Sequence, residues 1–179
     1  KTRIFFIPAL FRYPAHNSPE NPAPTITTSN LSNFLPKNCT KIIVNNVLLE
    51  VNKIMKRFYP DADIDYPDSS LKKPTKSKFK HVKFGNNVLI GKNVKIGKNS
   101  FIGSNTVIES NVLIGSNCII GSSVVIKNTL ISDNVNIQDG CKVGVKGFGF
   151  IPIPEKNLRM PHTGKVIIEE GVEIGANST

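Results

Sequence analysis

The most regular feature of the chain is an aliphatic or aromatic residue that returns every six positions between Phe84 and Ile126. The interval between Ile126 and the next such residue, Ile131, is five positions, after which the six-residue period continues to Val143. The period appears again at Ile168 and Ile174, close to Thr179. The positions that carry it are Phe84, Ile90, Ile96, Ile102, Ile108, Ile114, Ile120, Ile126, Ile131, Ile137, Val143, Ile168 and Ile174. This period predicts a solenoid in which each unit is one short strand with a tight turn, and three units complete a coil.

The residues between these positions agree with that interpretation. Glycine usually follows the apolar residue, and a small or β-branched residue stands four positions after it, where the interior of a coil is narrow. Asparagine, which tolerates the positive φ of a tight turn, recurs at 87, 93, 99, 105, 111 and 117. The pattern therefore predicts a mainly β protein with a parallel β-helix of hexapeptide repeats over residues 81–179. Cys118 and Cys141 take small inward positions and are interpreted as core fillers rather than nucleophiles.

A different pattern precedes the repeats. Lys41-Ile-Ile-Val44 is predicted to be a short buried strand, and apolar residues then recur at helical spacing, with Asn45 or Asn46 as the N-cap and Pro60 as the end. Those apolar residues are Val47, Leu48, Val51, Met55 and Phe58. We therefore expect a small α/β domain over residues 1–66. Residues 67–80, which are polar, Lys-rich and interrupted by Pro, are expected to be a linker.

The repeats are interrupted by an insertion over residues 145–166. It contains Gly147-Phe148-Gly149-Phe150, three prolines and His162. A coil can eject such a loop because each coil contacts only its neighbours, and loops of this kind often carry function. Two interpretations remain open: the loop is a lid or wall for an acyl chain or cofactor arm, or it folds back onto the coil with both phenylalanines packed down.

Composition limits the partners. The net charge is +10, and it comes from 19 Lys and only 4 Arg, whereas nucleic-acid binders usually depend on Arg. We expect no nucleic-acid partner; the excess is either compositional or forms a basic face for an acidic partner. The apolar run Ile4–Phe11 is too short to span a bilayer and no signal-peptide cleavage site follows it, so we expect a soluble, cytoplasmic protein. Three cysteines lie far apart and predict neither a disulfide framework nor a metal site.

Two segments carry a resemblance to a known family. The run GCKVGVKGFGF, the Pro-rich insertion and the run MPHTGKVIIEEGVEIGANST resemble the UDP-3-O-acylglucosamine N-acyltransferases of lipid A and lipopolysaccharide biosynthesis. The resemblance extends through residues 84–179 and, more loosely, to KIIVNNVLLEVNKIMKRFYP, which is similar to the end of the family's uridine-binding domain. Lys146 stands where the family usually has Asp. This resemblance, and not the periodicity, implies a left-handed helix.

The resemblance also implies an activity. The family is a homotrimeric acyltransferase that moves a 3-hydroxyacyl group from acyl carrier protein to the 2-amine of a UDP-glucosamine-type substrate, with no cofactor besides that thioester. A His acts as general base on the amine, a task that suits an imidazole near neutral pH. The residues implied here are Gly147, Phe148, Gly149, Phe150 and His162 for the substrate or acyl chain, and Phe6 and Tyr13 for the nucleotide.

The family's general base lies in a later coil, beyond Thr179. We therefore expect no catalytic residue in this chain, which resembles a copy truncated at its C-terminus and irregular at its N-terminus. His162 is interpreted as a substrate contact or a structural residue, and His16 and His81 as bystanders. The alternative is a non-catalytic remnant, or an assembly or binding solenoid of the same fold. A hexapeptide carbonic anhydrase would need three His ligands on facing coils, and no His occupies a hexad.

Overall fold

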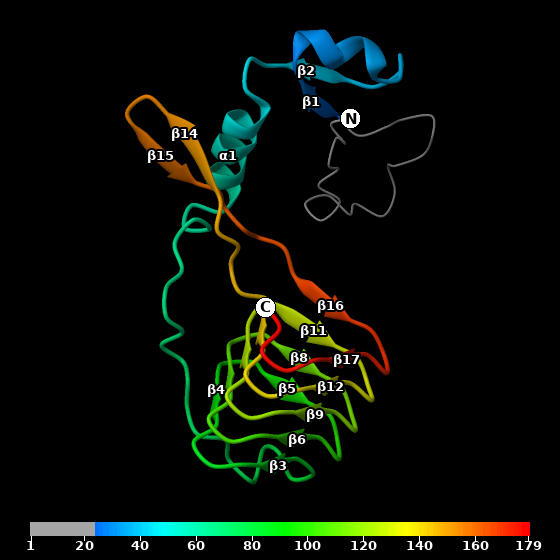
Figure 1. Cartoon of the computed structure of the whole chain (residues 1–179), viewed down its shortest axis with the longest axis vertical. Helices are drawn as coiled ribbons and strands as arrows, with labels where there is room; N and C mark the ends of the chain where they lie inside the picture. The colour runs from blue at the N-terminus through cyan, green and yellow to red at the C-terminus, as the bar shows by residue number, and fades with distance from the viewer. Residues whose placement is uncertain (1–23) are drawn as a thin grey trace. The chain divides into compact units, whose positions relative to one another are not determined.

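The computed structural model describes residues 24–179, which divide into two compact units (Figure 1). One unit, here called the β-helix unit, comprises Asp65–Gly147 and Lys165–Thr179. The other, here called the helix–hairpin unit, comprises the described residues up to Ile64 together with Phe148–Gly164. Phe148–Gly164, the larger part of the insertion predicted over 145–166, therefore groups with residues before the repeats.

The β-helix unit consists of short parallel strands that stack into three sheets, as Figure 1 shows. The first sheet has the order β13-β10-β7-β4, the second β16-β11-β8-β5 and the third β17-β12-β9-β6-β3. The strands are β3 (Lys83–Phe84), β4 (Leu89–Ile90), β5 (Lys95–Ile96), β6 (Phe101–Ile102), β7 (Val107–Ile108), β8 (Leu113–Ile114), β9 (Ile119–Ile120), β10 (Val125–Ile126), β11 (Thr129–Ile131), β12 (Asn136–Ile137), β13 (Lys142–Val143), β16 (Val166–Ile168) and β17 (Glu173–Ile174). The predicted mainly β fold of hexapeptide coils is confirmed, and the left hand implied by the resemblance stays a prediction.

The core of this unit is a set of aliphatic stacks. Ile90 pairs with Ile108, and Ile108 with Ile126, so equivalent residues of successive coils lie one above the other. Ile102, Ile108, Ile120, Ile126 and Ile137 have no exposed surface. Burial of such side chains from water is the main favourable contribution to the stability of the coils.

The small inward positions are also buried, as the spacing predicts. Ser100 and Thr106 have no exposed surface, and their hydroxyl groups donate to the carbonyls of Gly115 and Gly121 over 2.9 and 2.7 Å. Cys118 and Cys141 are equally inaccessible, and burial raises the pKa of the Cys118 thiol. Both cysteines are therefore core fillers, because a reactive cysteine needs access and a thiolate.

The recurring asparagines form the turns between faces. Asn87, Asn93, Asn99, Asn105, Asn111 and Asn117 have φ between 56° and 64°, the left-handed region that the sequence pattern predicts. Their amides also contact one another along the stack: Asn87 donates to Asn105 over 3.2 Å and Asn93 donates to Asn111 over 3.1 Å. Asparagine therefore serves both the local turn and the contact between coils.

Residues 67–80, expected as a linker, are instead packed into the β-helix unit. The Phe79 side chain is only 8% exposed, joins the core and meets the Phe84 ring edge-on at 5.7 Å. Lys72 forms an antiparallel bridge with Ile90. The polar composition suggested a free spacer, but one apolar side chain and several hydrogen bonds hold the segment on the coils.

The helix–hairpin unit contains β1 (Thr25–Thr27), the 3₁₀ helix η1 (Ser29–Phe34), β2 (Lys41–Ile43) and α1 (Val47–Phe58), and the hairpin β14 (Phe150–Ile153) and β15 (Lys156–Arg159). The helix begins as predicted, because the Asn46 side chain accepts from the Leu49 N–H over 3.0 Å. The expectation of a buried strand is wrong: Ile42 and Ile43 are 46% and 52% exposed. Within the described residues this sheet has only two strands, β1 and β2 in parallel, so much of the β2 surface stays uncovered.

Among residues 24–179, no helix has the length and apolar character needed to cross a bilayer.

Candidate functional site

The insertion forms an antiparallel hairpin with one buried and one exposed face. Ile151 lies opposite Leu158 on the inner face, and Ile151 is only 4% exposed. Phe150 lies opposite Arg159 on the other face, where Phe150 is 46% exposed. Alternation of this kind follows from the two-residue period of a strand. Pro152 is tolerated because both strands of an isolated hairpin are edge strands.

Helix α1 holds the hairpin through a buried amide. The Asn52 side chain is 2% exposed, and its Nδ2 donates to the Arg159 carbonyl over 3.0 Å. The same Nδ2 lies 4.0 Å from the Met160 sulfur. The Met160 N–H in turn donates to the Gly149 carbonyl over 2.9 Å, so the ladder continues to the base of the hairpin. These bonds fix the backbone on both sides of Phe150.

The two phenylalanines of the insertion form an exposed aromatic pair. Phe148 is 90% exposed, and its ring meets that of Phe150 at 5.0 Å with an interplanar angle of 76°. This edge-to-face arrangement is favourable between aromatic rings, but it leaves most of the Phe148 surface in water. Within the helix–hairpin unit, the Phe148 ring is therefore not packed down. The role of the pair as a lid or wall stays a prediction.

The other predicted site residues are less closely associated. The His162 side chain is exposed, and its backbone N–H donates to the Ala62 carbonyl over 3.4 Å. Gly149 has ordinary space around it, since an added Cβ would meet only the Met160 Cβ at 3.7 Å. Gly147 lies in the β-helix unit and Phe148 begins the other unit. Phe6 and Tyr13 lie outside the described residues.

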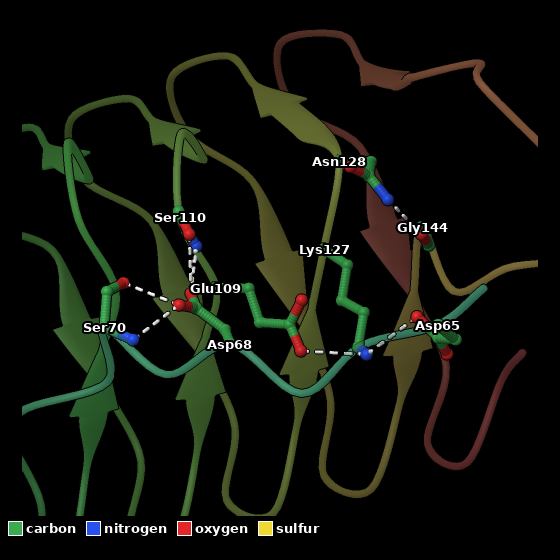
Figure 2. Close-up of polar contacts among 8 residues, drawn as sticks. All are labelled: Asp65, Asp68, Ser70, Glu109, Ser110, Lys127, Asn128 and Gly144. Atoms are coloured by element: carbon green, nitrogen blue, oxygen red, sulfur yellow. Dashed lines mark hydrogen bonds and ion pairs between the residues drawn. The ribbon is translucent and has the colours of Figure 1, made fainter. Parts of the chain in front are cut away.

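A second group of polar residues lies along one corner of the β-helix unit (Figure 2). The segment Asp65–Lys72, here called the strap, runs along this corner past successive coils. Asp65 lies 3.7 Å from the Lys127 Nζ, and the strap's Ser70 hydroxyl accepts from the Lys92 N–H over 2.8 Å. Lys92 and Ser110 stand at equivalent positions of two successive coils, and Lys127 follows the strand of the third, so the strap ties these three coils together.

Asp68 is the centre of the strap. One carboxylate oxygen accepts from the Ser70 N–H and hydroxyl over 2.8 and 2.6 Å, and the other accepts from the Ser110 N–H and hydroxyl over the same two distances. Burial by itself would raise the pKa of Asp68, but these hydrogen bonds together outweigh it and lower the pKa from 3.8 to about 2. The carboxylate is thus held ionised as an acceptor, and it is unsuited to act as a general base near neutral pH.

Lys127 forms an ion pair on the same corner (Figure 2). Its Nζ lies 2.8 Å from a Glu109 oxygen, and the two side chains are 16% and 20% exposed. The hydrogen bond to Glu109 raises the pKa of Lys127, with a further contribution from Asp65. Asp68, Glu109 and Lys127 are therefore each bound to neighbouring groups of this corner, and these contacts tie the coils together.

Comparisons with known proteins agree with the repeat. Residues 93–128 match the family described as "Bacterial transferase hexapeptide (six repeats)". The chain contains a hexapeptide-repeat domain. It is also similar to UDP-3-O-acylglucosamine N-acyltransferases: 52% identical over 40 residues to the protein of Microcystis aeruginosa and 58% identical over 41 residues to that of Methylococcus capsulatus. Each of these matches covers 22% of this chain and 12% of the relative, so only about an eighth of either relative is compared.

Two positioning residues were not foreseen from the sequence. Asn52 stands four residues after Leu48 and three before Met55, on the face of α1 that the apolar pattern marks. A lone polar residue on an apolar face is a recognisable signal of a buried hydrogen bond. The pair Asp-x-Ser at Asp68 and Ser70 is a weaker signal, typical of a local turn. The hydrogen bond that Asp68 accepts from Ser110 could not be foreseen from the sequence.

Proposed function

We propose that this chain acts in an N-acyltransferase that transfers a 3-hydroxyacyl group from acyl carrier protein to the 2-amine of UDP-3-O-acyl-glucosamine, in lipid A biosynthesis. The observation that carries the proposal is the identity of about one residue in two to enzymes of that name over roughly 40 residues. The hexapeptide coils and the ejected aromatic hairpin support it. The enzyme is proposed to work as a homotrimer.

The exposed aromatic pair is the proposed contact for the acyl chain. Phe148 and Phe150 present apolar surface that water covers in the isolated chain. Covering one such ring with an acyl chain gains about 1.5–3 kcal/mol. Arg159 is half-buried on the same face of the hairpin as Phe150, so a cation stands beside the apolar surface. This combination suits a ligand that has both an acyl chain and phosphate groups.

The chemistry requires the 2-amine to lose a proton as it attacks the thioester carbonyl. A general base must stand within hydrogen-bond reach of that amine. His162 is proposed as a substrate contact and not as this base, because no described residue hydrogen-bonds its imidazole or orients it. We assign no described residue as the general base.

Because no described residue is assigned as the general base, a second candidate function is a binding or assembly solenoid without catalysis. In that case the aromatic hairpin would still bind the acyl-bearing ligand, but no acyl group would be transferred. Both candidate functions predict binding of the acyl-bearing ligand, but only the enzyme is expected to transfer the acyl group.

The test is an acyl-transfer assay with 3-hydroxyacyl acyl carrier protein and UDP-3-O-acyl-glucosamine, with the product identified by mass spectrometry. The double variant Phe148→Ala/Phe150→Ala is expected to weaken the acyl-donor interaction at least about ten-fold. Phe101→Ala is the matched control, because Phe101 and Phe150 are 44% and 46% exposed and Phe101 lies outside the hairpin.

Binding is measured in parallel by calorimetry with each substrate. Binding that depends on the two phenylalanines, without turnover, would favour the binding solenoid. Absence of binding to both substrates would contradict the proposed function.

A further inference from the structure

After Asp65 and Asp68, the early part of the β-helix unit carries basic side chains without acidic ones. Residues 69–108 contain nine lysines and no Asp or Glu, in a chain whose net charge is +10. All nine lysines are exposed: Lys72, Lys73, Lys76, Lys78, Lys80, Lys83, Lys92, Lys95 and Lys98. Composition alone cannot explain this distribution, because the acidic residues of the chain are all found elsewhere.

Six of these lysines gather around two adjoining hollows of the surface. Lys72, Lys73, Lys78 and Lys92 line the first hollow, and Lys73, Lys76 and Lys83 line the second. Pro74 and Phe79 belong to both hollows. These six residues are here called the lysine cluster.

The lysine cluster has no ion-pair partner in the part of the chain that the structure describes. The Asp68 carboxylate reaches Gly91, at the edge of the first hollow, but it is engaged by Ser70 and Ser110. This carboxylate stays ionised, but six lysines outnumber it, and the excess of like charges produces a positive potential that attracts an anionic partner.

The chemistry of the cluster indicates which anionic partner it suits. A lysine ammonium is a mobile point charge without the planar fork with which arginine recognises a phosphate or carboxylate, and residues 69–108 contain no arginine. The Phe79 ring is 8% exposed, so it offers neither a stacking platform for bases nor an anchor for a protein interface. Each basic residue near an anionic membrane surface is attracted to it by about 1 kcal/mol, and clusters of four to eight such residues on amphipathic helices bind anionic headgroups, so six mobile lysines suit the same partner.

We propose that the lysine cluster docks the chain on the anionic phospholipid surface of a membrane. The contact is electrostatic and peripheral, with the lysines in the headgroup layer. It brings the β-helix unit to a surface from which an acyl-bearing lipid could be taken or to which one could be delivered. The proposal stands independently of the acyltransferase activity, because it rests on charge and exposure alone.

The test is flotation of the full chain with vesicles of phosphatidylcholine containing about one third phosphatidylglycerol, compared with phosphatidylcholine alone. The cluster variant carries Lys73→Gln, Lys76→Gln, Lys78→Gln and Lys83→Gln. The matched control carries Lys37→Gln, Lys95→Gln, Lys98→Gln and Lys165→Gln, four exposed lysines outside the hollows that remove the same net charge. Circular dichroism checks that both variants are folded.

The wild-type chain is expected to bind the anionic vesicles and not the neutral ones. Each lysine near such a surface strengthens binding up to about five-fold, so the cluster variant is expected to bind at least about ten-fold more weakly and the control much less so. About 1 M salt should abolish binding, since it shortens the Debye length to about 3 Å.

Two kinds of result would overturn the proposal. One is equal binding of wild type to neutral and anionic vesicles, or equal loss of binding in the two variants. The other is cluster-dependent binding to single-stranded DNA or to a folded acidic protein with no binding to anionic vesicles, which would assign the cluster to another class of macromolecule.

Discussion

The two units of this protein are held together over different distances in the sequence. In the β-helix unit, Asn87 contacts Asn105 and Ser100 contacts Cys118, pairs that are 18 residues apart. In the helix–hairpin unit, the bond that fixes the hairpin joins Asn52 to Arg159, residues that are 107 apart. The first kind of contact repeats at every coil, whereas the second is made once. Loss of one residue should therefore have different consequences in the two units.

The largest expected effect comes from the core of the coils. Ile120→Ala removes a side chain with no exposed surface and is expected to lower the free energy of unfolding by about 2–5 kcal/mol, because the stacked neighbours cannot close the cavity. The measurement is denaturant unfolding followed by circular dichroism. Ile119→Ala is the control, since the adjacent Ile119 side chain is 54% exposed and should cost far less. Equal losses in the two variants would show that inward stacking does not stabilise the coils.

The next effect tests the single long-range bond of the other unit. Asn52→Ala leaves the Arg159 carbonyl without its donor, at an expected cost of about 1–3 kcal/mol. Because the bond lies within the helix–hairpin unit, amide hydrogen exchange should rise in Phe150–Arg159 and stay unchanged in the coils. Asn157→Ala, at an exposed position of the same hairpin, should leave the exchange of both units as it is. Faster exchange throughout the coils would contradict the independence of the two units.

A smaller effect is expected at the turns. Asn105→Ala places an alanine at φ 59°, and the left-handed conformation should cost about 1–2 kcal/mol. Asn105→Gly should restore most of that loss, because glycine adopts this region without a steric penalty. Thermal unfolding of the two variants measures the difference. The control is Asn86→Ala, which changes an exposed asparagine one position before a left-handed residue and should be nearly neutral.

The smallest effect concerns the strap and its dependence on pH. The pKa of Asp68 is lowered to about 2 in the folded protein, so its contribution to stability is present above the unfolded value of about 3.8 and is lost as the pH falls through about 2. We expect the contribution to be about 0.5 kcal/mol, because the residue is only half-buried and solvent screens its interactions.

The matched variant for this prediction is Asp68→Asn, which keeps the shape and removes the titration. Unfolding by denaturant at pH 4 and pH 2 should show a larger loss of stability in the wild type than in the variant. An identical pH dependence would show that the four hydrogen bonds from Ser70 and Ser110 do not favour the ionised form.

Part of the candidate site could be predicted from sequence and part could not. The insertion, with its phenylalanines and His162, was visible because it interrupts a strict period. Its division into the strands β14 and β15, and its packing with α1, depended on contacts that no period records. The segment 67–80 differs from its prediction for the same reason. Its composition is polar, yet the buried Phe79 side chain and hydrogen bonds to Lys92 and Ser110 hold it on the coils.

What the sequence determined by itself is the architecture of the coils. A six-residue period places an isoleucine inward and an asparagine at a left-handed turn, and both requirements are local to one coil and the next. Only the tertiary structure decided where Asp68, Asn52 and the lysine cluster lie. Asp68 meets Ser110 across 42 residues, and six lysines between residues 72 and 92 share two hollows. These long-range contacts depend on the path of the whole chain, because a short polar side chain forms hydrogen bonds only with groups that the fold brings within about 3 Å of it.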